Sequence, residues 1–221
     1  MDEIQNLFLT ALRAGLRQER VNWEQPMETE RWAALFQLAA EHKVLPMIYE
    51  AVYACPSARA ADARLLAAYK QQTVLAVMQQ TRKTSDFLAL YAFLRESGVT
   101  PLVVKGIVCR TLYPKPDNRP SGDEDLLIPP EIFRKCHQAL LDYGMEVADP
   151  KADLDTAYEA PYRKPGSPLY IELHKRLFPP DSEAYGDLNR FFADARPETL
   201  TVGGQEIATL LPTEHLLYLI C

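Results

Sequence analysis

Residues 121–128 place three acidic side chains between a small-residue turn and a run of apolar residues typical of a strand. On a strand, Asp123 and Asp125 project from the same face with Cα atoms about 7 Å apart, whereas Glu124 projects from the opposite face. Two carboxylates at that distance repel by about 2.4 kcal/mol at an effective dielectric constant near 20. A partly enclosed pair therefore needs a cation or a shared proton, and oxygen ligands suit Mg²⁺. The competing interpretation is an acidic loop in water, which is the more common outcome for such a cluster.

A second strand candidate lies later in the chain, at residues 169–174. Its alternation places Glu172 between apolar neighbours, where a third carboxylate would meet Asp123 and Asp125 if the two strands are adjacent. A structural Glu at a sheet edge is the alternative. His174 lies two residues beyond Glu172 and projects from the same face of the strand. It is therefore a candidate for orienting a metal-binding side chain without binding the metal itself.

Two basic residues could contact phosphate. Lys105 and Gly106 follow a short apolar run at 102–104, and a strand that breaks at glycine before a helix presents backbone N–H groups to an anion. Arg119, just ahead of the acidic strand, could clamp a phosphate through its planar guanidinium. A solvent-facing loop arginine is the commoner outcome for such a residue.

Taken together, these features resemble the nucleotidyltransferases of the DNA polymerase beta superfamily. Within it the chain is most similar to a family of uncharacterised bacterial nucleotidyltransferases that carries Lys-Gly, Tyr-Pro, Arg and Asp-x-Asp-Leu-Leu in this order. The resemblance is strongest over residues 102–174 and looser in the preceding part and in residues 211–217.

The resemblance implies a small mixed sheet backed by helices. On it, Asp123 and Asp125 hold two Mg²⁺ ions, which Mn²⁺ can replace, and Glu172 completes the ligand set. Gly106 would be the glycine that grips the triphosphate of an NTP, with Lys105 as its basic neighbour. The implied reaction transfers a nucleoside monophosphate to a hydroxyl acceptor and releases pyrophosphate.

The sequence departs from the superfamily at two positions. Ile107 stands where a Ser or Gly usually follows the junction glycine, so a hydroxyl contact to phosphate is missing. Glu124 stands between the aspartates where an apolar residue is usual, and its charge must reach solvent or find a basic partner. Both departures suit an alternative function, a nucleotide-binding or regulatory module that has lost transfer. A third alternative is a helical interaction protein whose acidic strand has no role.

The elements that must position these residues change character near Gly98. Before it, apolar residues recur with helical spacing at 4–12, 32–39 and 58–94, which predicts three helices punctuated by prolines. After it, strands are expected at 102–104, 126–128, 145–148 and 169–174, with a helix at 130–143. Residues 149–167 read as a loop or weak hairpin, residues 202–205 as a tight turn, and residues 212–214 as the start of a last helix.

These elements predict an α/β (α+β) fold. A helical N-terminal domain at residues 1–98 precedes a nucleotidyltransferase-like core at residues 99–221. The last helix is apolar up to Cys221, so we expect the natural chain to continue, with docking of this helix in the core as the alternative.

Composition limits the classes of partner. With 24 basic and 30 acidic side chains the formal net charge is −6, which disfavours an extended nucleic acid as substrate and leaves a small molecule or a protein hydroxyl. The four cysteines are widely spaced and form no C-x-x-C pair, and no apolar stretch is long enough to span a bilayer. We therefore expect a cytoplasmic protein without a membrane partner.

Overall fold

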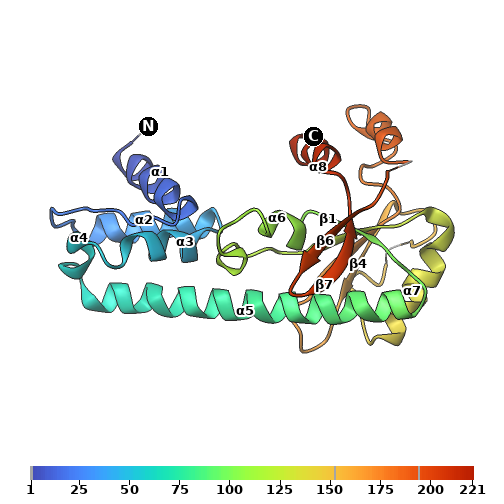
Figure 1. The fold of residues 1–221 in the computed structure, drawn as a ribbon, viewed down its shortest axis with the longest axis horizontal. Coiled ribbons are helices and arrows are strands. Elements are labelled where there is room, and N and C mark those ends of the chain that lie inside the picture. Colours follow the sequence, from blue (N-terminus) through green and yellow to red (C-terminus); the bar gives the residue numbers. More distant parts are fainter. Residues whose placement is uncertain (1, 152, 194) are drawn as a thin grey trace. The chain divides into compact units, whose positions relative to one another are not determined.

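The computed structural model describes residues 2–151, 153–193 and 195–221. The chain forms two compact units, and the division between them falls inside one long helix (Figure 1). The first unit, here called the helical unit, contains residues up to Thr81 together with Arg110–Ser121. The second, the sheet unit, contains Arg82–Cys109 and the residues from Gly122 onward. The domain boundary expected at residue 98 stays a prediction.

The helical unit packs several helices around one apolar core. That core includes Trp32, Leu35 and Phe36, all fully buried. The expected count of three helices before Gly98 is wrong. Pro46 and Pro56 lie in the first turn of two additional short helices and do not simply separate longer ones. Proline is tolerated there because the first helical turn needs no hydrogen bond from its N–H groups. The described helices up to Glu96 are α1 (Glu3–Leu16), α2 (Thr29–Glu41), α3 (Leu45–Val52), α4 (Pro56–Arg59) and α5 (Ala63–Glu96).

Seven strands form one mixed sheet in the described part of the sheet unit, in the order β3-β4-β5-β2-β1-β7-β6. The strands are β1 (Leu102–Val104), β2 (Glu124–Leu127), β3 (Glu146–Val147), β4 (Glu159–Arg163), β5 (Tyr170–His174), β6 (Glu198–Val202) and β7 (Gln205–Thr209). The pairs β2–β5 and β1–β7 are parallel, and the other neighbouring pairs are antiparallel. This architecture confirms the expected α+β class.

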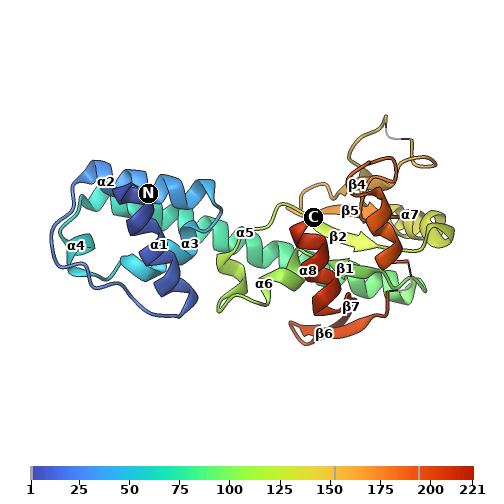
Figure 2. The same cartoon turned by 90° about the horizontal axis from the view of Figure 1, so that it is seen from above.

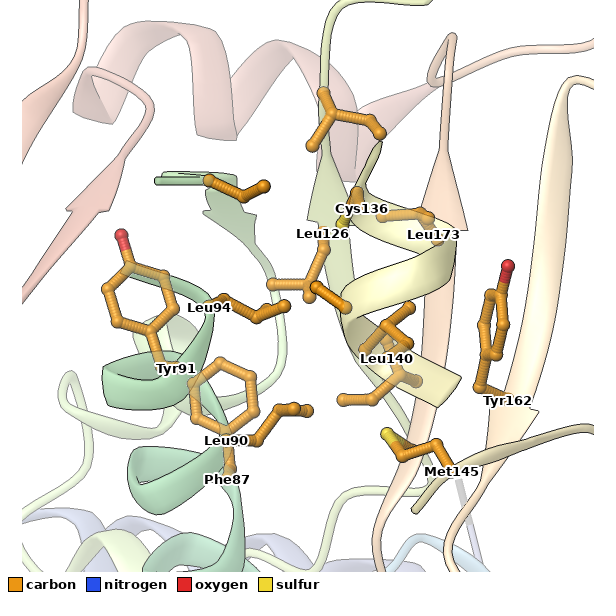
Figure 3. Close-up of a cluster of buried hydrophobic side chains, with 14 of the residues drawn as sticks. Phe87, Leu90, Tyr91, Leu94, Leu126, Cys136, Leu140, Met145, Tyr162 and Leu173 are labelled. Carbon is orange, nitrogen blue, oxygen red and sulfur yellow. The ribbon is translucent and has the colours of Figure 1, made fainter. Parts of the chain in front are cut away.

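Apolar residues cover both faces of the sheet. On one face, α7 (Phe133–Asp142) and the last turns of α5 pack against the strands; Figure 3 shows Leu90, Leu94 and Leu140 converging on Leu126 and Leu173. On the other face, α8 (Pro212–Ile220) and the 3₁₀ helix η3 (Gly186–Phe191) pack with Phe178 over β1 and β2 (Figure 2). The acidic residue Asp125 projects from this second face.

Most of the expected elements of the sheet unit are present. The turn at 202–205 joins β6 to β7 through Gly203 and Gly204, both with positive φ (57° and 81°), as a two-residue hairpin requires. The short helices α6 (Ile107–Arg110), η1 (Pro116–Asn118) and η2 (Pro130–Ile132) complete the chain. Of the two interpretations of residues 149–167, a loop or a weak hairpin, the loop is wrong over β4, which lies within this segment and pairs antiparallel along its whole length with β5.

Candidate active site

The parallel pairing of β2 with β5 brings two of the three predicted acidic residues, Asp125 and Glu172, together. Asp125 lies directly opposite Glu172, and Leu127 lies opposite His174, so all four side chains project from one face of the sheet. The Nε2 atom of His174 lies 3.0 Å from Asp125 Oδ1 and 3.7 Å from Glu172 Oε2. The expected adjacency of the two strands is therefore present, and His174 lies beside both carboxylates.

These three side chains fit a divalent cation. One ligand atom from each of Asp125, Glu172 and His174 can be chosen so that all lie within 4.8 Å of one another. Asp125 is fully buried, and its Oδ2 atom has no hydrogen-bond partner among the described residues. A buried carboxylate oxygen without a donor is uncommon, and a bound cation would satisfy it. Carboxylate oxygens and an imidazole nitrogen are suitable ligands for such an ion.

Lys105 carries the positive charge closest to these carboxylates in the described structure. Its Nζ atom lies 2.9 Å from Asp125 Oδ1 and 3.9 Å from Asp123 Oδ2. Partial burial alone would lower the pKa of Lys105, but attraction to Asp125 outweighs burial and raises it. Lys105 therefore carries its charge at any physiological pH.

His215 holds the backbone of Lys105 in place, a role that the sequence did not indicate. Lys105 has a positive φ of 35°, which is strained for a residue with a side chain. Its N–H donates to His215 Nε2 at 3.2 Å, while His215 Nδ1 lies 3.3 Å from the Leu210 carbonyl oxygen. Burial lowers the pKa of His215, so the neutral ring donates through Nδ1 and accepts through Nε2.

The charges of the cluster depend on one another. Burial raises the pKa of Asp125, although hydrogen bonds from His174 and Lys105 favour its charged form. Interaction with His174 lowers the pKa of Glu172. Burial alone would lower the pKa of His174, but the surrounding carboxylates, Asp125 first, raise it to about 9. Without a bound metal, the imidazolium of His174 and the ammonium of Lys105 together stabilise the converging carboxylates.

Glu159 is a member of the site that sequence reasoning missed. It lies opposite His174 in the β4–β5 pair, and its Oε2 atom is 3.3 Å from His174 Nδ1. The Glu159 carboxylate therefore stands close to the second ring nitrogen of His174 as an ion pair, without forming a hydrogen bond to it among the described residues. The available signal is the alternation of Ala160 and Tyr162, which are buried, with Glu159 and Pro161, which are less buried, but the Asp, Pro and Lys residues around this segment favour a loop or weak hairpin.

Stability should depend on the protonation of His174. Because the folded protein holds this proton more tightly than the unfolded chain, charged His174 stabilises the fold fully below pH 6.5, and the contribution is lost as the pH rises through about 9. We expect the metal-free protein's free energy of unfolding to fall across this window. Urea titrations at several pH values would measure it, and the same slope in His174→Gln would contradict this assignment.

Glu124 projects from the opposite face and is fully buried. Its Oε1 atom lies 3.8 Å from Lys83 Nζ, on α5, and its Oε2 atom accepts the Ile107 N–H at 2.5 Å. The charge thus finds a basic partner within the protein instead of reaching solvent. All four residues of β2 are buried, so Glu124 does not open this strand to water. The Ile107 N–H, one of the backbone donors at the glycine junction, is engaged by this internal carboxylate.

Gly106 is required by this packing. Its φ is +47°, and a Cβ atom at this position would overlap Glu124 Oε2 and approach the Asp123 carbonyl oxygen to 3.2 Å. Gly106→Ala should therefore lower the free energy of unfolding by about 1–3 kcal/mol, the usual range for a residue forced into such a backbone conformation. Urea unfolding would measure this loss, and a variant as stable as the wild type would rule out the close approach.

The remaining predicted residues lie outside the three-residue cluster. Asp123 precedes β2 and is partly exposed, and it reaches the site through its contact with Lys105. Arg119 belongs to the helical unit, where its guanidinium lies 5.4 Å from the centre of the Tyr113 ring. A role for Arg119 in binding phosphate stays a prediction.

Comparison with known proteins places this arrangement in a family. A family described as uncharacterised nucleotidyltransferase matches residues 28–221, which is more than half of the chain. No curated protein and no solved structure matches the chain. None of the described helices is both long and apolar enough to cross a membrane. The matched residues include the whole acidic cluster together with Lys105 and Gly106, and the chain belongs to the family of uncharacterised nucleotidyltransferases.

Proposed function

We propose that this protein transfers a nucleoside monophosphate from an NTP to a hydroxyl acceptor in a metal-dependent reaction. The observation that carries the proposal is the convergence of buried Asp125 and His174 with half-buried Glu172, with one Asp125 oxygen left without a hydrogen-bond donor among the described residues. Membership of the nucleotidyltransferase family supports the reaction type. Metal dependence, substrate and acceptor are parts of the proposal.

Asp125 and Glu172 would hold the cation, with Asp123 as a further ligand and His174 directed at both carboxylates. The ion expected is Mg²⁺, with two ions present during the reaction and Mn²⁺ able to substitute. When bound, such ions supply positive charge at the transferring phosphoryl group. The chain's own contribution is to hold the ligands on two rigid, adjacent strands, so that little reorganisation is needed during the reaction.

In the proposed step, the acceptor oxygen bonds to the α-phosphorus as the bond from that phosphorus to the bridging oxygen of pyrophosphate breaks. The Lys105 ammonium lies next to Asp125, where the proposed ion would bind. A phosphate tail bound to that ion would therefore come close to Lys105, whose positive charge would offset part of the negative charge of the tail. Glu172 has a lowered pKa, which makes it a weak base and a better ligand. The proton of the acceptor therefore passes to solvent.

The acceptor is proposed to be a small molecule or a protein hydroxyl. The net charge of −6 opposes the binding of an extended nucleic acid. No disulfide joins cysteines in the described part of the chain, which fits action in the cytoplasm.

Metal and nucleotide binding can be tested without knowing the acceptor. Mn²⁺ with a non-hydrolysable NTP analogue should raise the melting temperature, because a ligand present at 100 times its Kd stabilises the native state by about 2.7 kcal/mol. Isothermal titration with each NTP would then identify the base. No stabilisation by metal with any nucleotide would overturn the proposal.

One observation favours a second candidate, a nucleotide-binding or regulatory module. The Ile107 N–H is engaged by Glu124, so the glycine junction offers phosphate one donor fewer than the superfamily resemblance implies. Tight nucleotide binding without pyrophosphate release, over a broad panel of acceptors, would support the module. Release that depends on Asp125 would support the enzyme.

A further inference from the structure

A pocket of about 630 Å³ opens in the sheet unit, and its lining includes Leu127, which pairs with His174, and Lys175, which follows His174 in the chain. This volume lies within the range of pockets that bind small molecules. Its apolar wall contains Leu127, Ile128, Leu177 and Phe192, each at most 8% exposed. Apolar side chains that surround a cavity of this size favour a ligand with an apolar portion.

The pocket is basic in an acidic protein. Lys175, Arg176 and Arg190 line it, and Glu131 is the acidic residue among its described lining residues. The Lys175 ammonium donates to the carbonyl oxygens of Leu154 and Asp155, at 2.6 and 3.0 Å, and neither is among the described lining residues, so the charge that can meet a ligand is that of the two arginines. Arg176 and Arg190 are exposed, so their guanidinium groups can turn to a ligand. Arginine pairs well with carboxylate and phosphate, and this local charge therefore favours an anion.

The position of the pocket indicates which substrate it takes. In the antiparallel β1–β2 pair, Val104 lies opposite Asp125 and Leu102 lies opposite Leu127. Lys105 follows Val104 at one end of this pair, whereas Leu102 and Leu127 line the pocket at the other end. Asp125 lies between the two ends, and Leu127 is about 7 Å beyond it on the same face.

Phosphoryl transfer needs the attacking and leaving oxygens on opposite sides of the phosphorus. If the triphosphate tail lies toward Lys105, the acceptor must approach from the end occupied by the pocket. We propose that this pocket binds the acceptor, and that the acceptor is a small molecule with a carboxylate or phosphate group beside an apolar portion. This inference rests on the proposed function for the direction of transfer, and on the pocket alone for the chemistry of the ligand.

Binding can be measured with an anilinonaphthalene sulfonate dye, which has an aromatic body and one anionic group. The variants are Arg176→Gln/Arg190→Gln, which removes both mobile charges, and Ala193→Trp, which adds bulk at an exposed lining residue. Each should weaken dye binding about tenfold or more, the usual effect of losing charged contacts or the space for the ligand. Arg163→Gln is the matched control, because Arg163 is an exposed arginine on β4 that is paired with Glu146. Unchanged dye affinity in both pocket variants would overturn the inference.

The same proteins should then be titrated with Mn²⁺ and a non-hydrolysable NTP. We expect the pocket variants to bind the nucleotide as the wild type does. A tenfold loss in Arg176→Gln/Arg190→Gln would assign the pocket to the triphosphate and overturn its assignment to the acceptor. Failure of the wild type to bind nucleotide would instead reject the proposed function, while the dye result would still decide whether the pocket takes an apolar anion.

Discussion

Replacing Asp125 by asparagine is expected to slow pyrophosphate release by about 100- to 1000-fold, the usual loss when one preorganised electrostatic contact is removed. Asparagine keeps the size of the side chain but removes the charge that Lys105 and His174 both contact. It also replaces the buried Oδ2 or Oδ1 atom with an NH₂ group, which cannot bind a cation. Initial rates of pyrophosphate release with saturating Mg²⁺ would measure the effect.

Asp142→Asn is the control for this substitution. Asp142 is an exposed aspartate at the end of α7, in the same unit, and it accepts a hydrogen bond from Gln138. Its replacement should leave both the rate and the metal-dependent rise in melting temperature unchanged. If Asp125→Asn folds, retains that rise and releases pyrophosphate at the wild-type rate, then the cluster is not the site of transfer.

The sequence could predict which side chains share a face, because alternation along a strand is a local property. Asp125 and Glu172 follow this rule, and their strands were identified from apolar residues alone. Adjacency of the two strands is a property of the whole sheet, and the sequence could state it only as a condition. The parallel pairing of β2 with β5 satisfies that condition and also gives the register that sets Asp125 opposite Glu172.

Other parts of the site could not be predicted, because they depend on segments with weak local signals. Glu159 lies on β4, where Pro161 and the polar residues before it suggested a loop. Pro161 lacks the N–H of a strand residue, but its carbonyl oxygen still accepts the N–H of Ala148 at 2.8 Å. His215 lies 110 residues after Lys105, and nothing in its own helix indicates that it accepts the Lys105 N–H.

Glu124 illustrates the limit of local reasoning most clearly. Its position on the strand face opposite Asp125 followed from alternation, and so did the need for solvent or a basic partner. The choice between the two depended on α5, whose residue Lys83 lies 41 positions earlier in the chain and is only 4% exposed. Packing of that helix against the sheet buries both charges, and no pattern within residues 121–128 contains this information.

Removal of Glu124 should therefore cost more stability than any other single change considered for this unit. Glu124→Ala leaves the buried Lys83 without this carboxylate and the Ile107 N–H without its acceptor, which predicts a loss of about 3–5 kcal/mol. Glu124→Gln keeps the shape and an acceptor oxygen for Ile107, so it should lose less. Hydrogen exchange of peptides that cover β1 and β2, with urea unfolding, would measure both losses.

The same residue supplies a test of why position 106 is glycine. A Cβ atom at Gly106 meets the Glu124 carboxylate, so Gly106→Ala should cost less stability in the Glu124→Ala background than in the wild type. In that background only the strain of a positive φ and the 3.2 Å approach to the Asp123 carbonyl oxygen remain. Equal losses in both backgrounds would contradict this coupling. Glu124 lies on the sheet face opposite Asp125 and accepts the N–H of Ile107, the residue after Gly106. The coupling would therefore also explain how Glu124 fixes the backbone at residues 105–107, from which the Lys105 side chain reaches Asp125 on the other face.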